Sequence, residues 1–177
     1  PFGGKPDRLR NLLDDKPVGL NNLKDNASKD LISWMLSHHP KDRPSAKEEL
    51  KHPYLQPAKL QFEMLCKMGN QQEIKKADSN SSVVQSLNKN PTDWRTPIKP
   101  DVLKYLCTDS INDKPKKFIY KSSWTECLRL IRNVNQHWHD RRPMPQPEAF
   151  YLVGDPQQYF LNLFPSLPVE VHRIVRS

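Results

Sequence analysis

The chain has 177 residues, which is enough for one domain, or for one domain and part of another. Its 17 prolines and only 5 scattered glycines exclude a Rossmann fingerprint and a P-loop, because both need closely spaced glycines where backbone amides approach a phosphate. Lys and Arg outnumber Asp and Glu by 28 to 20, and the net charge of +8 favours a phosphate-rich partner, although a basic surface can also serve solubility alone.

The cysteines and the N-terminal residues indicate the cellular compartment in which the chain is expected. Cys66, Cys107 and Cys127 are odd in number and widely spaced, which argues against a disulfide framework and a zinc site and favours a reducing, cytoplasmic setting. No apolar run approaches the roughly 18 residues of a membrane-spanning helix. The start, Pro1 to Gly4, has neither an initiator Met nor a signal pattern, so we expect a piece of a longer protein.

The first predicted elements are two helices that follow an irregular stretch over residues 1–25. Apolar residues with helical spacing predict a helix from Ser28 to about His38, with Ser28 as its cap. Ser45 and Glu48 form a capping box, in which each side chain satisfies a backbone amide of the other, and this box opens a short second helix.

The rest of the chain also shows helix signals. Loops are predicted over residues 70–82, 108–117 and 139–149. Gly69 is expected to end the helix before the first loop, as a C′ residue. Besides one longer helix treated next, the predicted helices span residues 59–68, 82–87, 100–106, 156–164 and the segment after Pro168. We therefore expect an all-α fold.

The most informative helix is predicted from Ser123 to Trp138, opened by a second capping box between Ser123 and Glu126. At about 100° per residue, one sector is apolar and is predicted to face the core. This core sector holds Trp124, Cys127, Leu128, Ile131, Val134, Asn135 and Trp138. The opposite, polar sector holds Glu126, Arg129, Leu130, Asn133 and His137, with Arg132 at its edge.

Part of the polar sector has the ingredients for phosphoryl transfer without a metal. His137 follows Asn133 by one turn, and Arg132 lies at the rim. A histidine titrates near neutrality and can protonate a leaving oxygen, while Arg and Asn can hydrogen-bond phosphate oxygens as charge builds on them. RNA suits such a site because its own 2′-hydroxyl supplies the nucleophile. The alternative, from these residues alone, is an ordinary solvated helix face.

For other candidate residues, a functional role is weighed against a structural one. His137 and His139 diverge by about 200° on a helix, so a metal site built on both is not expected. Glu126 is either the reciprocal half of its capping box, which we favour, or an acid catalyst. Trp94 and Tyr120 are either packed aromatic residues or platforms on which a base stacks.

Residues 1–57 resemble the end of a protein-kinase C-lobe. The resemblance rests on Pro40-Lys41-Asp42-Arg43-Pro44-Ser45-Ala46 and on His52-Pro53. In kinases the Arg of this motif, here Arg43, pairs with a Glu of the activation segment. The Gly-rich loop, the strand Lys and the H-R-D and D-F-G motifs do not occur in this sequence. We therefore expect neither kinase activity nor a bound cofactor in this fragment, because nucleotide and magnesium would bind the missing part of the kinase.

Residues 58–177 resemble the KEN domain, the kinase-extension nuclease found in RNase L and in the inositol-requiring kinase/endoribonuclease of the unfolded-protein response. The matching segments are Gly69-Asn70, Asp93-Trp94-Arg95, Tyr120, the block from Leu128 to His137, Gly154-Asp155-Pro156, Tyr159-Phe160 and Phe164-Pro165. The resemblance implies a metal-independent endoribonuclease that leaves a cyclic phosphate and a 5′-hydroxyl end. It implies RNA as the partner, with no DNA and no membrane contact by this fragment.

The resemblance also implies roles for single residues. It assigns the general acid to His137, phosphate contact to Arg132 and Asn133, and the general base to Tyr120. Trp94 matches a family tryptophan near the RNA site, and Arg129 lies in the matched block, so both are assigned to RNA binding or support. Glu126 joins them as a departure, because the family usually has Asp there.

Family members are similar in their regulation, which implies a homodimer normally controlled by the attached kinase(-like) domain. The Glu126 departure keeps two rivals open. One is a catalytically weak or dead KEN-like dimerisation module, and the other is a non-enzymatic basic RNA-binding domain. The parent protein lies either on the cytosolic face of the endoplasmic reticulum or free in the cytosol.

Overall fold

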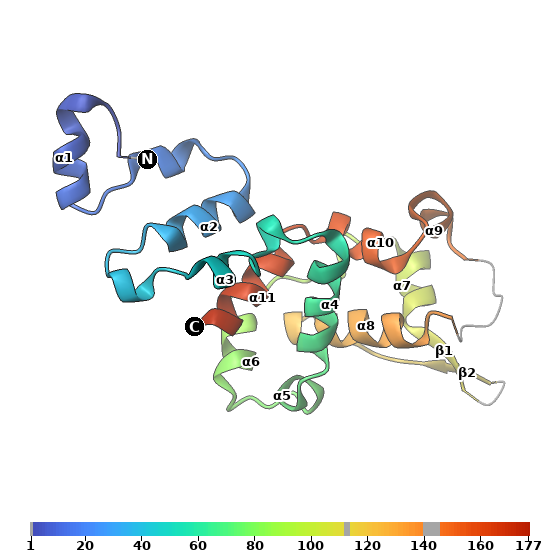
Figure 1. Cartoon of the computed structure of the whole chain (residues 1–177). Coiled ribbons are helices and arrows are strands. Elements are labelled where there is room, and N and C mark those ends of the chain that lie inside the picture. The colour runs from blue at the N-terminus through green and yellow to red at the C-terminus, as the bar shows by residue number, and fades with distance from the viewer. Residues whose placement is uncertain (1, 112–113, 140–145) are drawn as a thin grey trace. The chain divides into compact units, whose positions relative to one another are not determined.

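The computed structural model describes residues 2–111, 114–139 and 146–177. Contacts between residues divide the chain into two compact units, Pro1–Pro57 and Ala58–Ser177, which are treated separately below (Figure 1). Part of the connection predicted over residues 139–149 lies outside the described residues. Among the described residues, no helix combines the length and the apolar character needed to cross a bilayer.

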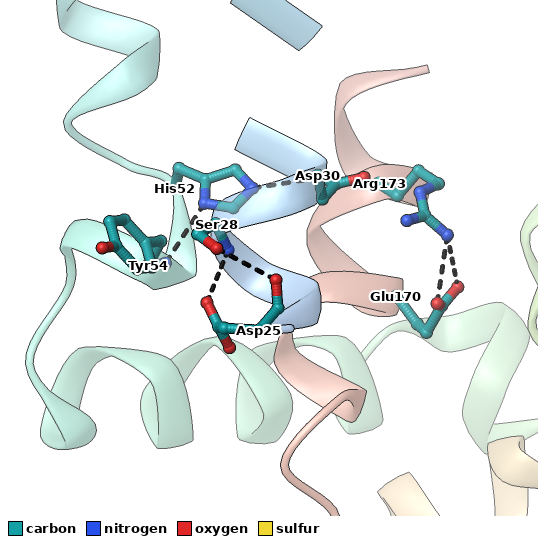
Figure 2. Close-up of polar contacts among 7 residues, drawn as sticks. All are labelled: Asp25, Ser28, Asp30, His52, Tyr54, Glu170 and Arg173. Atoms are coloured by element: carbon teal, nitrogen blue, oxygen red, sulfur yellow. Dashed lines mark hydrogen bonds and ion pairs between the residues drawn. The ribbon is translucent and has the colours of Figure 1, made fainter. Parts of the chain in front are cut away.

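The first unit is built from short helices and turns. It contains the helices α1 (Lys5–Leu13), α2 (Asn26–Met35) and α3 (Ala46–Glu49), and 3-10 turns at Val18–Asn22, Pro40–Asp42 and Pro53–Leu55. The predicted cap of α2 is wrong, because Asp25 caps this helix by accepting a hydrogen bond from the Ser28 amide at 2.7 Å (Figure 2). The capping box of Ser45 and Glu48 is confirmed.

A buried histidine joins α2 to the turn that follows α3. The ring of His52 is fully buried, and its Nδ1 accepts a hydrogen bond from the Tyr54 amide at 3.1 Å. Nε2 must then carry the proton that lies between His52 and the Asp30 carboxylate, 3.0 Å away (Figure 2). Arg43, the residue matched to a kinase motif, donates to the carbonyls of Ser37 and His38.

The second unit is helical apart from one hairpin, so the predicted all-α class is confirmed. Helix α5 falls in a segment predicted as a loop, α9 begins at the end of another, and α1 of the first unit falls in the stretch predicted as irregular. The helices are α4 (Ala58–Gly69), α5 (Gln72–Lys75), α6 (Ser82–Leu87), α7 (Pro100–Leu106), α8 (Trp124–His137), α9 (Glu148–Val153), α10 (Pro156–Leu163) and α11 (Leu167–Arg176). Ion pairs three residues apart support exposed helix faces, as between Glu170 and Arg173 of α11 at 3.0 Å (Figure 2).

The hairpin occupies the segment that was predicted as a loop. Strand β1 (Thr108–Ile111) pairs antiparallel with β2 (Lys114–Lys117), and Thr108 lies opposite Lys117. The ladder continues beyond the strands, because the Phe118 amide donates to the Cys107 carbonyl at 2.7 Å. The segment lacks an apolar alternation that would have predicted strands. Backbone pairing next to α7 therefore forms this hairpin without a sequence signal.

Helix α8 lies at the centre of the second unit and crosses α4 (Figure 1). Leu65 of α4 and Leu128 and Ile131 of α8 are fully buried in this contact region of the core. Three assignments of the helical sectors were wrong. Leu130 and Glu126 are buried although they lie in the polar sector, and Asn135 is exposed although it lies in the core sector. The early turns of α8 are covered by neighbouring elements on several sides, whereas its last turn emerges into solvent.

The N-terminus of α8 is capped by a distant residue. The capping box predicted for Ser123 and Glu126 is wrong, because the Glu126 carboxylate binds Arg129 instead. The Asn88 side chain accepts from the Thr125 amide at 3.3 Å and donates to the Thr125 hydroxyl at 3.2 Å. One unpaired amide at the start of α8 is thus satisfied by a side chain from the segment after α6.

Gly69 is the last residue of α4 and has a structural role different from the predicted one. A Cβ at this position would lie 2.2 Å from the Leu128 carbonyl oxygen and 3.0 Å from the Arg132 Cβ. The absence of a side chain therefore lets the end of α4 touch the backbone of α8. This close contact brings the residue after Gly69 within reach of the polar side of α8.

Candidate functional site

Asn133 lies at the centre of a chain of polar side chains. The guanidinium of Arg132 donates to its amide oxygen at 2.6 Å, and its amide nitrogen donates to the Tyr120 hydroxyl at 2.7 Å. Because a guanidinium has donors only, Arg132 fixes which end of the amide faces it and turns the nitrogen toward Tyr120. Three residues predicted for the site are therefore brought together, one of them from a different segment.

Tyr120 is buried and its hydroxyl accepts the hydrogen bond from Asn133. Burial raises the pKa of its phenol, and the Asn133 donor opposes that rise by stabilising the phenolate. The hydroxyl is thus neutral at physiological pH, with its oxygen partly occupied and its own proton available for donation. A phosphate or a sugar hydroxyl that reaches it would meet a hydrogen-bond donor.

Arg132 is held from a second direction by a residue that was not assigned to the site. Its Nε donates to the Asn70 side-chain oxygen at 3.2 Å, across 62 positions of sequence. Asn70 follows directly on Gly69, so the close approach of α4 to α8 places it beside the arginine. The pair Gly69-Asn70 is among the family-like segments, and this was the only sign in the sequence that Asn70 could matter.

His137 is the last residue of α8 and follows Asn133 by one turn. Its side chain is exposed to solvent. The Glu126 and Arg129 side chains form an ion pair within α8, and the Glu126 carboxylate is buried. This pair lies on the helix between the Asn88 cap and the polar chain of Asn133.

Trp94 and its neighbour Arg95 hold the backbone that carries Tyr120. Trp94 is only 1% exposed, and its indole nitrogen donates to the carbonyl of Lys121 at 2.9 Å. Arg95 donates to the Tyr120 carbonyl at 3.4 Å and is itself paired with Asp93 at 2.7 Å. Because so little of its surface is exposed, Trp94 supports the site from the core. This favours its interpretation as a packed aromatic residue over a platform for base stacking. Arg95 was not predicted as a supporting residue.

These contacts define the class of the site. A helical domain presents a guanidinium, an amide and a phenol in one hydrogen-bonded chain, with a histidine one turn away. Such a set can bind a phosphate, orient a hydroxyl and exchange a proton near neutral pH.

Comparisons with known proteins agree with this class. The family model described as Ribonuclease 2-5A matches residues 61–177. The chain is 26% identical to the human 2-5A-dependent ribonuclease over 155 residues, which cover 84% of this chain and 20% of that protein. It is 31% identical over 149 residues to the serine/threonine-protein kinase/endoribonuclease IRE1 of Hypocrea jecorina, covering 84% of this chain and 12% of that protein. It is 28% identical over 184 residues to human IRE2, covering 100% of this chain and 19% of that protein.

The chain belongs to the Ribonuclease 2-5A family, which confirms the resemblance to the KEN domain. It spans about a fifth of the length of the 2-5A-dependent ribonucleases that it matches.

Proposed function

We propose that this chain carries an endoribonuclease that cleaves RNA by attack of the 2′-hydroxyl and needs no metal. The observation that carries the proposal is the hydrogen-bonded chain of Tyr120, Asn133 and Arg132, one helical turn before His137. The 2′-oxygen bonds to phosphorus, the bond from phosphorus to the 5′-oxygen breaks, and a cyclic phosphate and a 5′-hydroxyl result. One group must accept the 2′-proton, and another must give a proton to the 5′-oxygen.

In this proposal each residue has a distinct part. His137 gives the proton to the leaving 5′-oxygen, since it is exposed and lies one helical turn from Asn133. Arg132 stabilises the charge that grows on the phosphate. Asn133 holds the arginine and the phenol in a fixed position relative to each other through its two hydrogen bonds. Tyr120 contacts the 2′-hydroxyl, and its oxygen accepts the 2′-proton while its own phenolic proton passes to a water molecule. The Asn133 hydrogen bond favours the phenolate and so offsets part of the rise in the pKa of Tyr120 that burial causes.

We further propose that the ribonuclease acts as a homodimer, with RNA as its partner and without a nucleotide or metal cofactor in this fragment. Residues 1–57 are inferred to be the end of a kinase(-like) domain whose missing part normally controls dimerisation. The isolated chain should then show activity that rises faster than linearly with its concentration, because mass action must assemble the dimer.

The experiment is cleavage of a fluorescent RNA hairpin in EDTA, at low and high protein concentration, with the His137→Ala variant beside the wild type. Cleavage that survives EDTA, rises steeply with concentration and vanishes in the variant would support the proposal. Full activity of a monomer, shown by sedimentation at nanomolar concentration, would refute the dimer. Cleavage that persists in His137→Ala would refute the assigned acid.

A catalytically weak or dead module is the second candidate. The resemblance to the KEN domain implies an Asp where this chain has Glu126, and the longer carboxylate is buried against Arg129. The Glu126→Asp variant separates the two. A large gain of cleavage would show a damaged site, whereas unchanged or lower cleavage would support an intact one. RNA binding that weakens steeply with salt while no product forms would instead indicate a binding domain.

A further inference from the structure

A pocket of about 370 Å³ opens at the start of α8, within the second unit. Its walls come from α6, from the segment that follows α6, from the first residue of α8, and from α11 and the corner that precedes it. Helix α6 contacts both α8 and α11 around this pocket (Figure 1). A pocket of this size is in the range that binds small ligands.

The pocket is separate from the polar chain of Asn133. Trp124, which lines the pocket, is the first residue of α8, and His137 is the last. The helix between them spans about 20 Å at 1.5 Å per residue. Tyr120, Arg132 and Asn133 are not among the described residues that line the pocket. A ligand in this pocket therefore does not touch the groups proposed to cut RNA.

Two aromatic rings shape the wall of the pocket. Trp124 and Phe164 meet edge to face, with ring centres 5.5 Å apart and planes at 89°. Phe164 is buried, whereas Trp124 is only half-buried although it lies in the core sector of α8. Leu87 and Leu167 are both buried and extend the apolar wall. A flat aromatic ligand would bury more of the Trp124 surface and pack against this wall.

The polar groups of the pocket include hydroxyls, an amide and a carboxylate. Ser86, Asn90 and Thr92 are exposed and supply neutral groups. Among the described lining residues, Glu170 is the only ionisable one, on a chain whose net charge is +8. Both oxygens of its carboxylate accept from Arg173 at 3.0 Å, and a carboxylate has lone pairs for further donors (Figure 2). The pocket therefore accepts N–H donors and offers no lining cation to an anionic ligand.

Glu170 also compensates the N-terminus of α11. It lies in the first turn of that helix, where the helix dipole favours negative charge. The protein itself thus supplies the negative charge that this end of the helix favours. An anionic ligand would add a second negative charge beside the first.

We propose that this pocket binds a small aromatic amine with one ring or two fused rings, at a site apart from the proposed ribonuclease centre. The ring packs against Trp124 and Phe164, and the amine donates to the Glu170 carboxylate. Leu87 of the pocket wall directly precedes Asn88, which caps α8, so the bound ligand also supports the contact between α6 and the start of α8. An anion of the same shape binds more weakly because its charge meets no lining cation.

Binding is measured by NMR on the full chain, isotope-labelled at nitrogen, with naphthylmethylamine as the probe and naphthoate as its anionic counterpart. The chain has 4 tryptophans, and each gives one indole N–H signal. Trp124→Phe identifies the signal of the pocket by its disappearance. The amine should shift the Trp124 signal and leave the other indole signals in place. Naphthoate, which has the same rings and the opposite charge, should bind about tenfold more weakly.

Ser86→Phe and Ser82→Phe form a matched pair of variants. Both serines are exposed on α6, but only Ser86 lines the pocket. A phenyl ring at Ser86 occupies space that the ligand needs, so Ser86→Phe should weaken binding of the amine about tenfold or more. Ser82→Phe should bind the amine as the wild type does. Thermal unfolding of both variants checks that the fold persists.

Glu170→Gln tests the charge separately from the shape. It keeps the size of the side chain and removes the negative charge, so binding of the amine should weaken about two- to fivefold, the usual range for an exposed ion pair. The preference for the amine over naphthoate should shrink with it.

Three results would overturn the proposal. A Trp124 signal that stays in place up to the solubility limit of the amine would refute the site. Equal binding of the amine by Ser86→Phe and Ser82→Phe would show that the probe lies elsewhere. Naphthoate that binds as tightly as the amine would refute the assigned ligand chemistry. Each measurement is made without RNA, so it is independent of whether the chain cuts RNA.

Discussion

Gly69→Ala tests whether the contact between α4 and α8 positions the site. An alanine Cβ would lie 2.2 Å from the Leu128 carbonyl oxygen and 2.8 Å from its carbon. A carbon and an oxygen are comfortable at about 3.3 Å, so the two helices must separate by about 1 Å. The clashing carbonyl belongs to the backbone, so it cannot rotate away. We therefore expect a loss in the free energy of unfolding at the upper end of the usual range for overpacking, about 3 kcal/mol.

Helix propensity acts in the opposite direction, because it favours alanine and so offsets part of the cost of the clash. Alanine is better than glycine inside a helix by about 1 kcal/mol, which leaves a net loss of about 2 kcal/mol. For a chain of this size we expect the melting temperature to fall by roughly 4–8 °C. Urea unfolding and calorimetry measure the change. A Gly69→Ala chain as stable as the wild type, or more stable, would refute the close contact.

The same substitution should affect activity through Arg132. Separation of the helices carries Asn70 away from the arginine Nε, now 3.2 Å from its side-chain oxygen. A displacement of about 1 Å in a catalytic group can cost about a hundredfold in rate. Asn70→Ala is the matched variant, because it removes the hydrogen bond without a clash. It should lower cleavage while changing stability by no more than about 0.5 kcal/mol.

Three further predictions concern stability. Asp155→Ala should cost about 0.5–2 kcal/mol in urea unfolding, because Asp155 caps α10 by accepting from the Gln158 amide at 2.8 Å, and Asp155→Ser should recover most of the loss. Arg129→Leu should cost about 1–3 kcal/mol, because it takes the partner from the buried Glu126 carboxylate; adding Glu126→Gln should restore stability, and a failure to do so would argue against the pair. Burial raises the pKa of Cys66 from 9.0 to about 12, so the folded chain favours the neutral thiol. The contribution of this thiol to the free energy of unfolding is complete below pH 9 and is lost as pH rises toward 12. Cys66→Ala should therefore reduce the decrease in the urea midpoint between pH 9 and pH 12. An unchanged decrease would refute this prediction.

Much of the fold could be predicted from the sequence because its signals are local. Helix-forming periodicity, Pro100 at the first position of α7 and the Asp155 cap of α10 each act within a few residues, and the helices predicted from such signals lie close to their predicted places. The same locality placed Arg132, Asn133 and His137 on one helix at the spacing of a turn. These residues could be chosen as candidates without any knowledge of how α8 packs.

The tertiary structure decided how those candidates are held. Asn70 reaches Arg132 across 62 positions, Asn88 caps α8 across 37, and Arg95 reaches the Tyr120 carbonyl across 25. A periodic pattern reports only on neighbours within one or two turns, so it could reveal none of these contacts. The sequence pattern also led to the wrong role for Gly69. A glycine at a helix end gives the same sequence signal whether it ends the helix as a C′ residue or lets a neighbouring backbone approach closely. The helices and the reactive groups follow from local sequence, whereas the geometry of the site follows from the packing of α4 against α8.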